Sequence, residues 1–390
     1  MKIPITKPFF GEEEKRAIVE PLESGWVVQG TFVKEFEKKF SAFTGAPFSI
    51  ATTSCTTALH VAVAALGLKP GDEVIVPAFT WVSTANVVEY MGAKPVFCDI
   101  NLHTFNIKTE LIKSLITPRT VGIIPVHLFG LCGDMKPILE ITEKHNLWVV
   151  EDAACAFGAW YHGRHAGTFG DIGCFSFHPR KAITTGEGGM ITTGNPELDR
   201  FSRTLRDHGA SRTDFDRETM KSAFLLADFN HLGYNYRMTD IQGALGCAQM
   251  ERAHWIIAER SRRARLYNEM LASVEWLGMP GVPDGYVHGY QAYVCLFRPE
   301  EPTLENVDRL SRQRNDLMAR LEAKRIATRQ GTHAPVIQGY YAEKYGLLPE
   351  QFPNAYLADR LSLTLPLYVQ MTEAEQALVI SELQKNFEEL

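Results

Sequence analysis

Lys181 and Asp152 are the two residues of this chain whose types and surroundings best fit covalent chemistry. Asp152 ends the apolar run at residues 147–152, and a hydrophobic run that stops at a carboxylate predicts a buried strand with an acid at its carboxyl end. Lys181 ends the run at residues 176–181 and precedes a glycine-rich turn at residues 184–189. Because ligands of open α/β sheets bind at the carboxyl ends of the strands, we expect the acid and the amine to meet there.

A lysine amine and a buried acid at one site are what pyridoxal phosphate requires of a protein. The amine bonds to the aldehyde of this cofactor, and the acid keeps the pyridine nitrogen protonated so that the ring can draw electrons from the substrate. Amino-group transfer is therefore the first hypothesis for the pair. Taken singly, each residue has a plainer reading, because most lysines are solvated surface residues and many aspartates after strands cap helices.

Other residues are candidates for contacts to such a cofactor. Small hydroxyl residues at 54–57 open a strongly apolar helix, where free amides and the helix dipole would hold a phosphate, although a simple helix cap explains the same pattern. Trp81 follows a predicted strand and would either stack on a flat ring or belong to the core. The loop at residues 233–238 would either supply Asn235 and Arg237 to an anionic group or lie at the surface.

The composition narrows the class of protein. The 390 residues suffice for two domains, or for a large domain and a smaller one. With 45% hydrophobic and 22% charged residues, the chain resembles an ordinary soluble enzyme. The formal net charge of −6 gives no reason to expect nucleic acid or a membrane as partner. No stretch approaches the ~18 apolar residues that span a bilayer, and the first residues do not form a secretory signal.

The cysteine and histidine patterns do not predict a metal site or a disulfide framework. The seven cysteines are odd in number and include no Cys-x-x-Cys pair, so a reducing cytoplasm fits them best. The twelve histidines are scattered without the spacing of metal ligands. The nucleophile elbow, the Walker loop, the dinucleotide-binding glycine motif and the zinc-protease motif are missing from the sequence.

Strand and helix patterns alternate through the first two-thirds of the chain. This alternation favours βαβ units and a largely parallel sheet. We expect strands at residues 74–76, 95–99, 121–126, 147–152, 173–177 and 189–193. Helical patterns fall between them, for example at residues 135–145.

The pattern changes near residue 250. We interpret residues 1–250 as a large domain and residues 251–390 as a smaller α+β domain, connected by a long helix at residues 244–270. The arginines at 260–265 in this helix favour a solvated face over a binding patch, because acids are interspersed among them. Within the smaller domain we expect one strand at residues 293–297 and a last helix at residues 372–387, which a capping box opens.

These pieces, in this order, resemble the DegT/DnrJ/EryC1/StrS family of sugar aminotransferases. The resemblance extends over most of the chain and rests on ordered blocks, which together are far more specific than any one of them. The blocks lie at residues 24–30, 36–37, 54–59, 77–81, 151–154, 167–171, 176–189, 205–209 and 233–238.

The resemblance implies fold type I, the aspartate aminotransferase-like α/β architecture, with pyridoxal 5'-phosphate as cofactor and a homodimer as the working unit. Lys181 matches the lysine that bonds to the cofactor, and Asp152 matches the acid paired with the pyridine nitrogen. Trp81 falls where an aromatic residue stacks on the ring. Thr56, Ser176 and the backbone at Cys55 match phosphate contacts. Asn235 matches the residue that reaches the phosphate from the neighbouring subunit, which implies that a monomer is inactive.

Two positions depart from the family pattern. Cys155 stands where many members have glutamine, histidine or glutamate near the ring hydroxyl, and a thiol is a weak hydrogen-bonding group. Cys55 stands where glycine is common, so that its small side chain would approach the phosphate.

The resemblance implies glutamate as amino donor and a keto sugar as acceptor, above all a nucleotide-linked keto-deoxyhexose. Arg237, together with Arg329 and His333 in the segment at 328–333, is a candidate for acceptor recognition, although that segment reads equally well as a polar interdomain loop. An eight- or nine-carbon sugar and a cyclitol ketone remain alternative acceptors. Lipopolysaccharide, other surface glycans, glycoproteins and antibiotic sugars are all compatible destinations of the product.

Two rival functions are set against this hypothesis. Sugar dehydratases of the family have a histidine in place of the lysine, so Lys181 argues against that reaction. A non-catalytic binding or regulatory protein would tend to have lost the lysine or the acid, whereas this chain has both Lys181 and Asp152.

Overall fold

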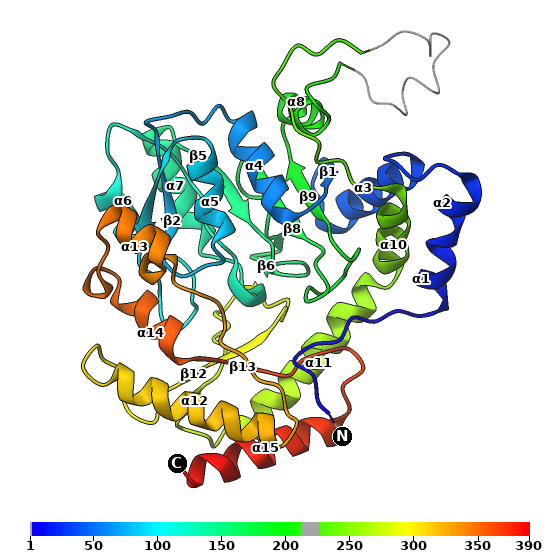
Figure 1. The fold of residues 1–390 in the computed structure, drawn as a ribbon. Coiled ribbons are helices and arrows are strands. Elements are labelled where there is room, and N and C mark those ends of the chain that lie inside the picture. The colour runs from blue at the N-terminus through cyan, green and yellow to red at the C-terminus, as the bar shows by residue number, and fades with distance from the viewer. Residues whose placement is uncertain (1, 212–226) are drawn as a thin grey trace.

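A seven-stranded sheet forms the centre of the computed structural model, which describes residues 2–211 and 227–390 (Figure 1). Its strand order is β1-β9-β8-β5-β4-β2-β3, and β9 runs antiparallel to both of its neighbours while the other pairs are parallel. The strands are β1 Phe48–Thr52, β2 Glu73–Pro77, β3 Lys94–Cys98, β4 Thr120–Ile123, β5 Trp148–Asp152, β8 Ile172–Ser176 and β9 Gly189–Thr193. The expected largely parallel α/β architecture is therefore confirmed.

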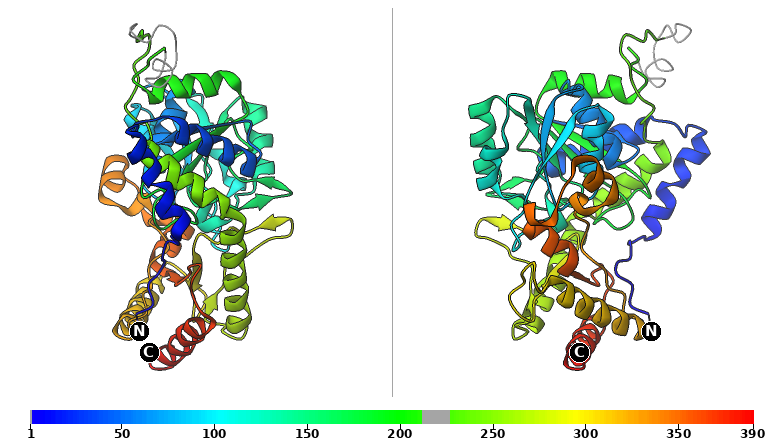
Figure 2. Two further views of the ribbon diagram at one scale, coloured as in Figure 1. Left: turned by 90° about the vertical axis from the view of Figure 1, so that its right-hand side faces the viewer. Right: turned by 60° about the vertical axis from the view of Figure 1, so that its left-hand side comes forward.

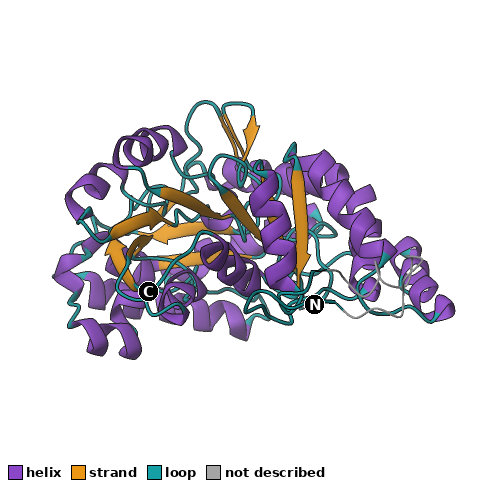
Figure 3. Cartoon of the chain, turned by 90° about the horizontal axis from the view of Figure 1, so that it is seen from above, coloured by secondary structure: helices purple, strands orange, loops and turns teal. Residues whose placement is uncertain are grey.

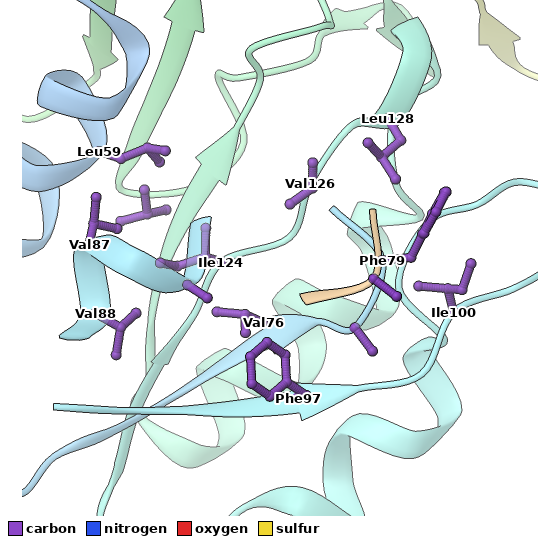
Figure 4. Packing of buried hydrophobic residues seen from close by; sticks show 14 of the residues in the cluster. Leu59, Val76, Phe79, Val87, Val88, Phe97, Ile100, Ile124, Val126 and Leu128 are labelled. Atoms are coloured by element: carbon purple, nitrogen blue, oxygen red, sulfur yellow. The ribbon is translucent and has the colours of Figure 1, made fainter. Parts of the chain in front are cut away.

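Both faces of this sheet are buried, which is why its strands read as continuous apolar runs rather than as alternating ones. Val74 and Val76 of β2 point into one hydrophobic cluster, whereas Ile75 between them points into the cluster on the opposite face. Figure 4 shows the first cluster, in which Val76 lies with Val87 and Val88 of α5. The sheet is therefore held between two layers of helices.

The helices lie on both sides of the strands (Figure 3). Residues of α4 and α5 pack into the first cluster, and residues of α3, α6 and α7 pack into the second. The helices before the chain turns to its C-terminal part are α1 Glu12–Ala17, α2 Val19–Ser24, α3 Thr31–Thr44, α4 Cys55–Ala65, α5 Ser83–Tyr90, α6 Thr109–Leu115, α7 Met135–His145, α8 Pro196–Arg206 and α10 Asp240–Glu251.

The C-terminal part has its own small antiparallel sheet and a third hydrophobic cluster. The sheet, in the order β10-β12-β13, consists of β10 Leu277–Gly278, β12 Tyr293–Phe297 and β13 Ser362–Leu365. Its helices are α11 Ala253–Leu271, α12 Val307–Ala323, α13 Gly339–Tyr345, α14 Pro353–Leu361 and α15 Glu373–Glu388. A further sheet joins β6 Trp160–Tyr161, β7 Arg164–His165 and β11 Tyr286–Val287.

Both ends of the chain lie beside this C-terminal part (Figure 2). Ile3 belongs to its hydrophobic cluster and pairs with Ile326, so the first residues of the chain pack with the last third. The division into residues 1–250 and 251–390 remains a prediction. Within the described part of the chain, no helix combines the length and the apolar character that crossing a membrane requires.

Three sequence expectations need correction. The helix expected at residues 244–270 begins earlier and is interrupted at Arg252, which separates α10 from α11. Its arginines do not form one solvated face, because Arg260 and Arg263 are buried and donate hydrogen bonds to the carbonyls of Tyr290 and Met371. In addition, the strand expected at 121–126 ends at Ile123.

Candidate active site

A cavity of about 550 Å³ lies where β5 and β8 of the large sheet reach their carboxyl ends. It collects most of the residues that the sequence singled out, although they lie far apart along the chain. Those that line it are Cys55, Thr56, Trp81, Asp152, Cys155, Ser176, Lys181, Arg329 and His333. The expectation that the acid and the lysine meet at one sheet edge is thus met by the geometry.

Asp152 is the last residue of β5 and is only 4% exposed. Its backbone N–H donates to the Pro125 carbonyl at 2.9 Å, which fixes the end of the strand. One carboxylate oxygen accepts from the Thr84 hydroxyl at 2.7 Å and the other accepts from the Ala154 N–H at 3.2 Å. Burial raises the pKa of Asp152, while these two hydrogen bonds oppose the rise because they stabilise the anion.

Glu151, the neighbour of Asp152 on β5, binds the end of this strand to the loop at residues 166–170. Its fully buried carboxylate accepts hydrogen bonds from the backbone N–H groups of Gly167, Phe169 and Gly170 at 2.6–2.7 Å. It also pairs with Nε2 of His127 at 2.8 Å. A buried carboxylate with this many donors is fully satisfied, so it secures the loop at 166–170 against β5.

Lys181 lies in the loop between β8 and β9, where its N–H donates to the His178 carbonyl at 2.8 Å. Its ammonium Nζ lies 3.1 Å from Sγ of Cys155, which is half-buried in the cavity wall. A thiol, which is a weak hydrogen-bonding group, therefore lies next to the lysine amine.

The N-terminus of α4 forms the end of the cavity where a phosphate is expected. Ser54 caps the helix by accepting from the Thr57 N–H at 3.2 Å, and the Thr56 hydroxyl lies 2.9 Å from that of Ser83. The Cys55 thiol contacts the carbonyl of Cys174 on β8, so the side chain is held against the sheet. Burial raises the pKa of Cys55, which keeps the thiol neutral.

Gly189, the first residue of β9, allows the sheet to approach this helix terminus closely. A Cβ at this position would lie 2.3 Å from the Ser54 carbonyl oxygen and 2.7 Å from the Cys55 nitrogen. Since real Cβ contacts of that length do not occur, any larger residue must push α4 away from β9.

We therefore expect Gly189→Ala to weaken cofactor binding at least about 10-fold and to lower stability by about 1–3 kcal/mol, the usual cost of overpacking. A fluorescence titration with pyridoxal phosphate and thermal unfolding of the cofactor-free chain would measure both effects. Gly194→Ala is the matched control, because a Cβ there meets nothing within 4 Å. Equal affinity in the two variants would show that the close approach does not shape the site.

The mouth of the cavity is formed by Trp81 and the loop at 328–333. Trp81 is 55% exposed, and its ring centroid lies 6.2 Å from that of His333. The two segments are joined because the Thr80 N–H donates to the His333 carbonyl at 3.0 Å. Trp81 is therefore a cavity residue rather than a core residue, and Arg329 and His333 lie at the same opening.

Asn235 and Arg237 lie outside this cavity. Asn235 forms a β-bridge with Asp207, and the Arg237 guanidinium pairs with the carboxylate of the same residue. The loop that holds them is also attached to the start of the phosphate region, because the Thr53 N–H donates to the Tyr236 carbonyl at 3.0 Å. The assignment of Asn235 to the site of a neighbouring subunit remains a prediction, as does that of Arg237 to an anionic group.

Sequence reasoning missed several residues of the site. The cavity is also lined by His178, Arg180, Glu187 and Gln291, and Thr84 contacts Asp152 from beneath it. His178, Arg180 and Glu187 flank Lys181 in sequence, so proximity to the lysine was a usable signal. Burial lowers the pKa of His178 and favours the neutral ring.

The residues present fit pyridoxal phosphate. A helix terminus with free amides and hydroxyls suits the phosphate, a buried acid suits the pyridine nitrogen, a lysine suits the aldehyde, and an indole suits the face of the ring. Across residues 2–211 and 227–390, no three histidine, cysteine or acidic side chains gather as a metal ion would require.

Comparisons with known proteins agree with this geometry. GDP-perosamine synthase of Caulobacter vibrioides is 38% identical over 98% of this chain and 97% of its own length. The spore coat polysaccharide biosynthesis protein SpsC of Bacillus subtilis is 36% identical over 95% of this chain and 93% of its own. A putative sugar aminotransferase of Streptococcus pneumoniae, solved in its PMP form, is 28% identical with a TM-score of 0.91 and covers 99% of each chain.

The same streptococcal protein has also been solved in its PLP form, with a TM-score of 0.90. Residues 8–384 of the present chain match the DegT/DnrJ/EryC1/StrS aminotransferase family. The expectations of fold type I and of pyridoxal phosphate as cofactor are confirmed. A family match over nearly the whole chain and a cavity with the required lysine and acid lead to one conclusion: this chain belongs to the DegT/DnrJ/EryC1/StrS aminotransferase family of pyridoxal-phosphate-dependent enzymes.

Proposed function

We propose that this aminotransferase moves an amino group from glutamate to the keto group of a nucleotide-linked deoxyhexose. The product would be an amino sugar for a surface glycan or another natural product. The observation that carries the proposal is that Lys181, Asp152 and the N-terminus of α4 surround one cavity.

The names of two relatives support the sugar acceptor. GDP-perosamine synthase is named for a GDP-linked product, and SpsC is named for the biosynthesis of a spore coat polysaccharide. The cavity lining adds a physical argument, because it includes Leu128, Leu365 and Leu367 beside its polar residues. An apolar wall suits the deoxygenated edge of a hexose better than a fully hydroxylated one.

Pyridoxal phosphate, when bound, supplies an electron sink and holds the amino group between the two half-reactions. Lys181 would anchor the cofactor and then, once freed, carry the proton to and from the substrate carbon. Asp152 would keep the pyridine nitrogen protonated, which is the electrostatic part of catalysis. Thr56 and Ser176 would bind the phosphate, while Trp81 would orient the ring.

We place the site in a homodimer, in which Asn235 serves the cavity of the partner. Two observations support this arrangement. Asn235 lies outside the cavity of its own chain, and large apolar side chains near it are exposed, with Phe229 at 65% and Leu232 at 88%. The compartment we propose is the cytoplasm, where the cysteines, all free in the structure, would remain reduced.

The first test is an absorbance spectrum of the purified protein with added pyridoxal phosphate, recorded before and after excess L-glutamate. We expect a visible band that forms with the cofactor and is bleached by L-glutamate, because Lys181 releases the cofactor to the donor. D-glutamate is the matched control and should leave the band unchanged. A band that ignores L-glutamate would point to another donor, and no band at all would favour a non-catalytic binding protein.

The acceptor is then tested on the glutamate-treated protein, freed of excess donor. Return of the visible band with a nucleotide-linked 4-keto-6-deoxyhexose would support the proposed acceptor. Return of the band only with a long-chain keto sugar or a cyclitol ketone would replace it. This acceptor test requires that glutamate has bleached the band in the first test. Its outcome then depends only on which acceptor restores the band.

A further inference from the structure

Thr84 is a buried residue of α5 that touches the acid of the site without lining the cavity. Its hydroxyl lies 2.7 Å from a carboxylate oxygen of Asp152, 2.9 Å from the hydroxyl of Thr80 and 3.1 Å from the carbonyl of Trp81. Thr80 and Thr84 are fully buried. One side chain thus contacts both the acid expected at the pyridine nitrogen and the backbone of the residue expected on the ring face.

The direction of these hydrogen bonds follows from the number of protons. A hydroxyl has one proton, and an ionised carboxylate can only accept. When Asp152 is ionised, the Thr84 proton must therefore point to Asp152, and Thr80 must donate to the oxygen of Thr84. When Asp152 is protonated, the carboxyl can donate to Thr84, whose own proton then turns to the Trp81 carbonyl.

The remaining polar neighbours of Asp152 do not replace this contact. Apart from Thr84, only the Ala154 N–H donates a hydrogen bond to the carboxylate among the described residues. The titratable groups that act on Asp152 from the surrounding elements are Lys181, His127, Cys55 and Cys174. Because burial holds both thiols neutral, the groups that favour the anion are Thr84, Ala154, Lys181 and His127.

We propose that Thr84 is a positioning residue that keeps Asp152 ionised toward the pyridine nitrogen and ties it to Trp81. The inference rests on the role of Asp152 in the proposed function and adds a residue that acts through it. Without the Thr84 hydroxyl, the buried carboxylate loses one of its two donors and becomes more basic, so the proton shared with the pyridine nitrogen moves toward Asp152.

The test is ¹⁵N NMR of the protein loaded with ring-¹⁵N pyridoxal phosphate, which reads the protonation of the nitrogen directly and does not depend on turnover. In Thr84→Val, which keeps the side-chain shape, we expect the ratio of protonated to unprotonated nitrogen at neutral pH to fall by about 10- to 100-fold, because the carboxylate takes the shared proton; this is the size expected for a charge-assisted hydrogen bond. Thr84→Ser restores the hydroxyl and should return this ratio to the wild-type value. If the valine variant does not fold, Thr84→Ala replaces it, and the same change in nitrogen protonation is expected.

Two reference variants separate the outcomes. Thr44→Val is the matched control, because the Thr44 hydroxyl is also buried and also donates to a backbone carbonyl, at 3.0 Å, but far from the site. In Asp152→Asn the nitrogen should be deprotonated at neutral pH. If Asp152→Asn loses the proton and Thr84→Val does not, the inference about Thr84 alone is overturned. If Asp152→Asn keeps the proton, both this inference and the assigned role of Asp152 are overturned.

Discussion

Replacing Lys181 with alanine should abolish transamination, by at least about 10⁴-fold in kcat, while the folded chain still binds pyridoxal phosphate. The loss is large because the same amine would anchor the cofactor and move the proton, and no second amine lines the cavity within the described residues. Retention of the cofactor is expected because the phosphate and ring contacts come from α4, β8 and Trp81. Lys181 is only half-buried, so the substitution should change stability by less than about 0.5 kcal/mol.

Single-turnover assays with glutamate would measure the chemical step, and gel filtration followed by absorbance would measure the bound cofactor. Lys113→Ala, at an exposed lysine of α6, is the matched control and should keep full activity. Measurable turnover by the Lys181 variant would remove the lysine from its assigned role. Loss of the cofactor together with activity would show instead that the covalent bond dominates binding.

The parts of the fold that could be predicted are those specified by local sequence. The run ending at Asp152 forms β5, the segment around Met190 forms β9, and the segment beginning at Met135 forms α7 as expected. Each has a clear hydrophobic pattern and a turn or polar residue at its end. The positions of Lys181 and Asp152 at one cavity follow from the rule for open α/β sheets, combined with the order of the motifs.

The burial of Arg260 and Arg263 could not be predicted, because its cause lies in distant backbone. Arg260 donates to the carbonyls of Tyr290 and Gln291, and Arg263 donates to that of Met371. A charge pattern along a helix describes how polar the side chains are, not which carbonyls lie opposite them. Burial removes water from Arg260 and lowers its pKa to about 10, so these carbonyls must replace the lost hydration.

Thr84 and Asn235 illustrate two further limits of sequence reasoning. A threonine on a helix is ordinary in sequence, and only the crossing of α5 beneath the end of β5 turns its hydroxyl toward Asp152. Asn235 was assigned through the family resemblance to a site on another chain. Asn235 does not line the cavity of its own chain. A contact across a subunit interface depends on the surface of two chains, which the local sequence around Asn235 does not describe.

Asp152→Asn should lower kcat by about 10²–10³-fold, because a neutral amide cannot stabilise a protonated pyridine nitrogen as a carboxylate does. The amide nevertheless fits the site: its NH₂ group can donate to Thr84, its oxygen can accept from Ala154, and the Thr84 proton can turn to the Trp81 carbonyl. Single-turnover rates with glutamate, after saturation with cofactor, would measure the effect. A rate close to that of the wild type would mean that the nitrogen does not need the acid.

The same substitution should make the cofactor-free chain more stable at neutral pH. Burial raises the pKa of Asp152 in the folded chain, so the folded state binds this proton more tightly than the unfolded state does. As pH rises through the unfolded pKa of aspartate, about 3.9, the wild type loses stability relative to the asparagine variant, until pH exceeds the folded pKa. Thermal unfolding from pH 4 to pH 7.5 should therefore show an advantage of the variant that grows with pH and then levels off. If the stability advantage of the variant is absent or independent of pH, the pKa of Asp152 is not raised in the folded chain. Ionisation of Asp152 then does not destabilise the cofactor-free fold.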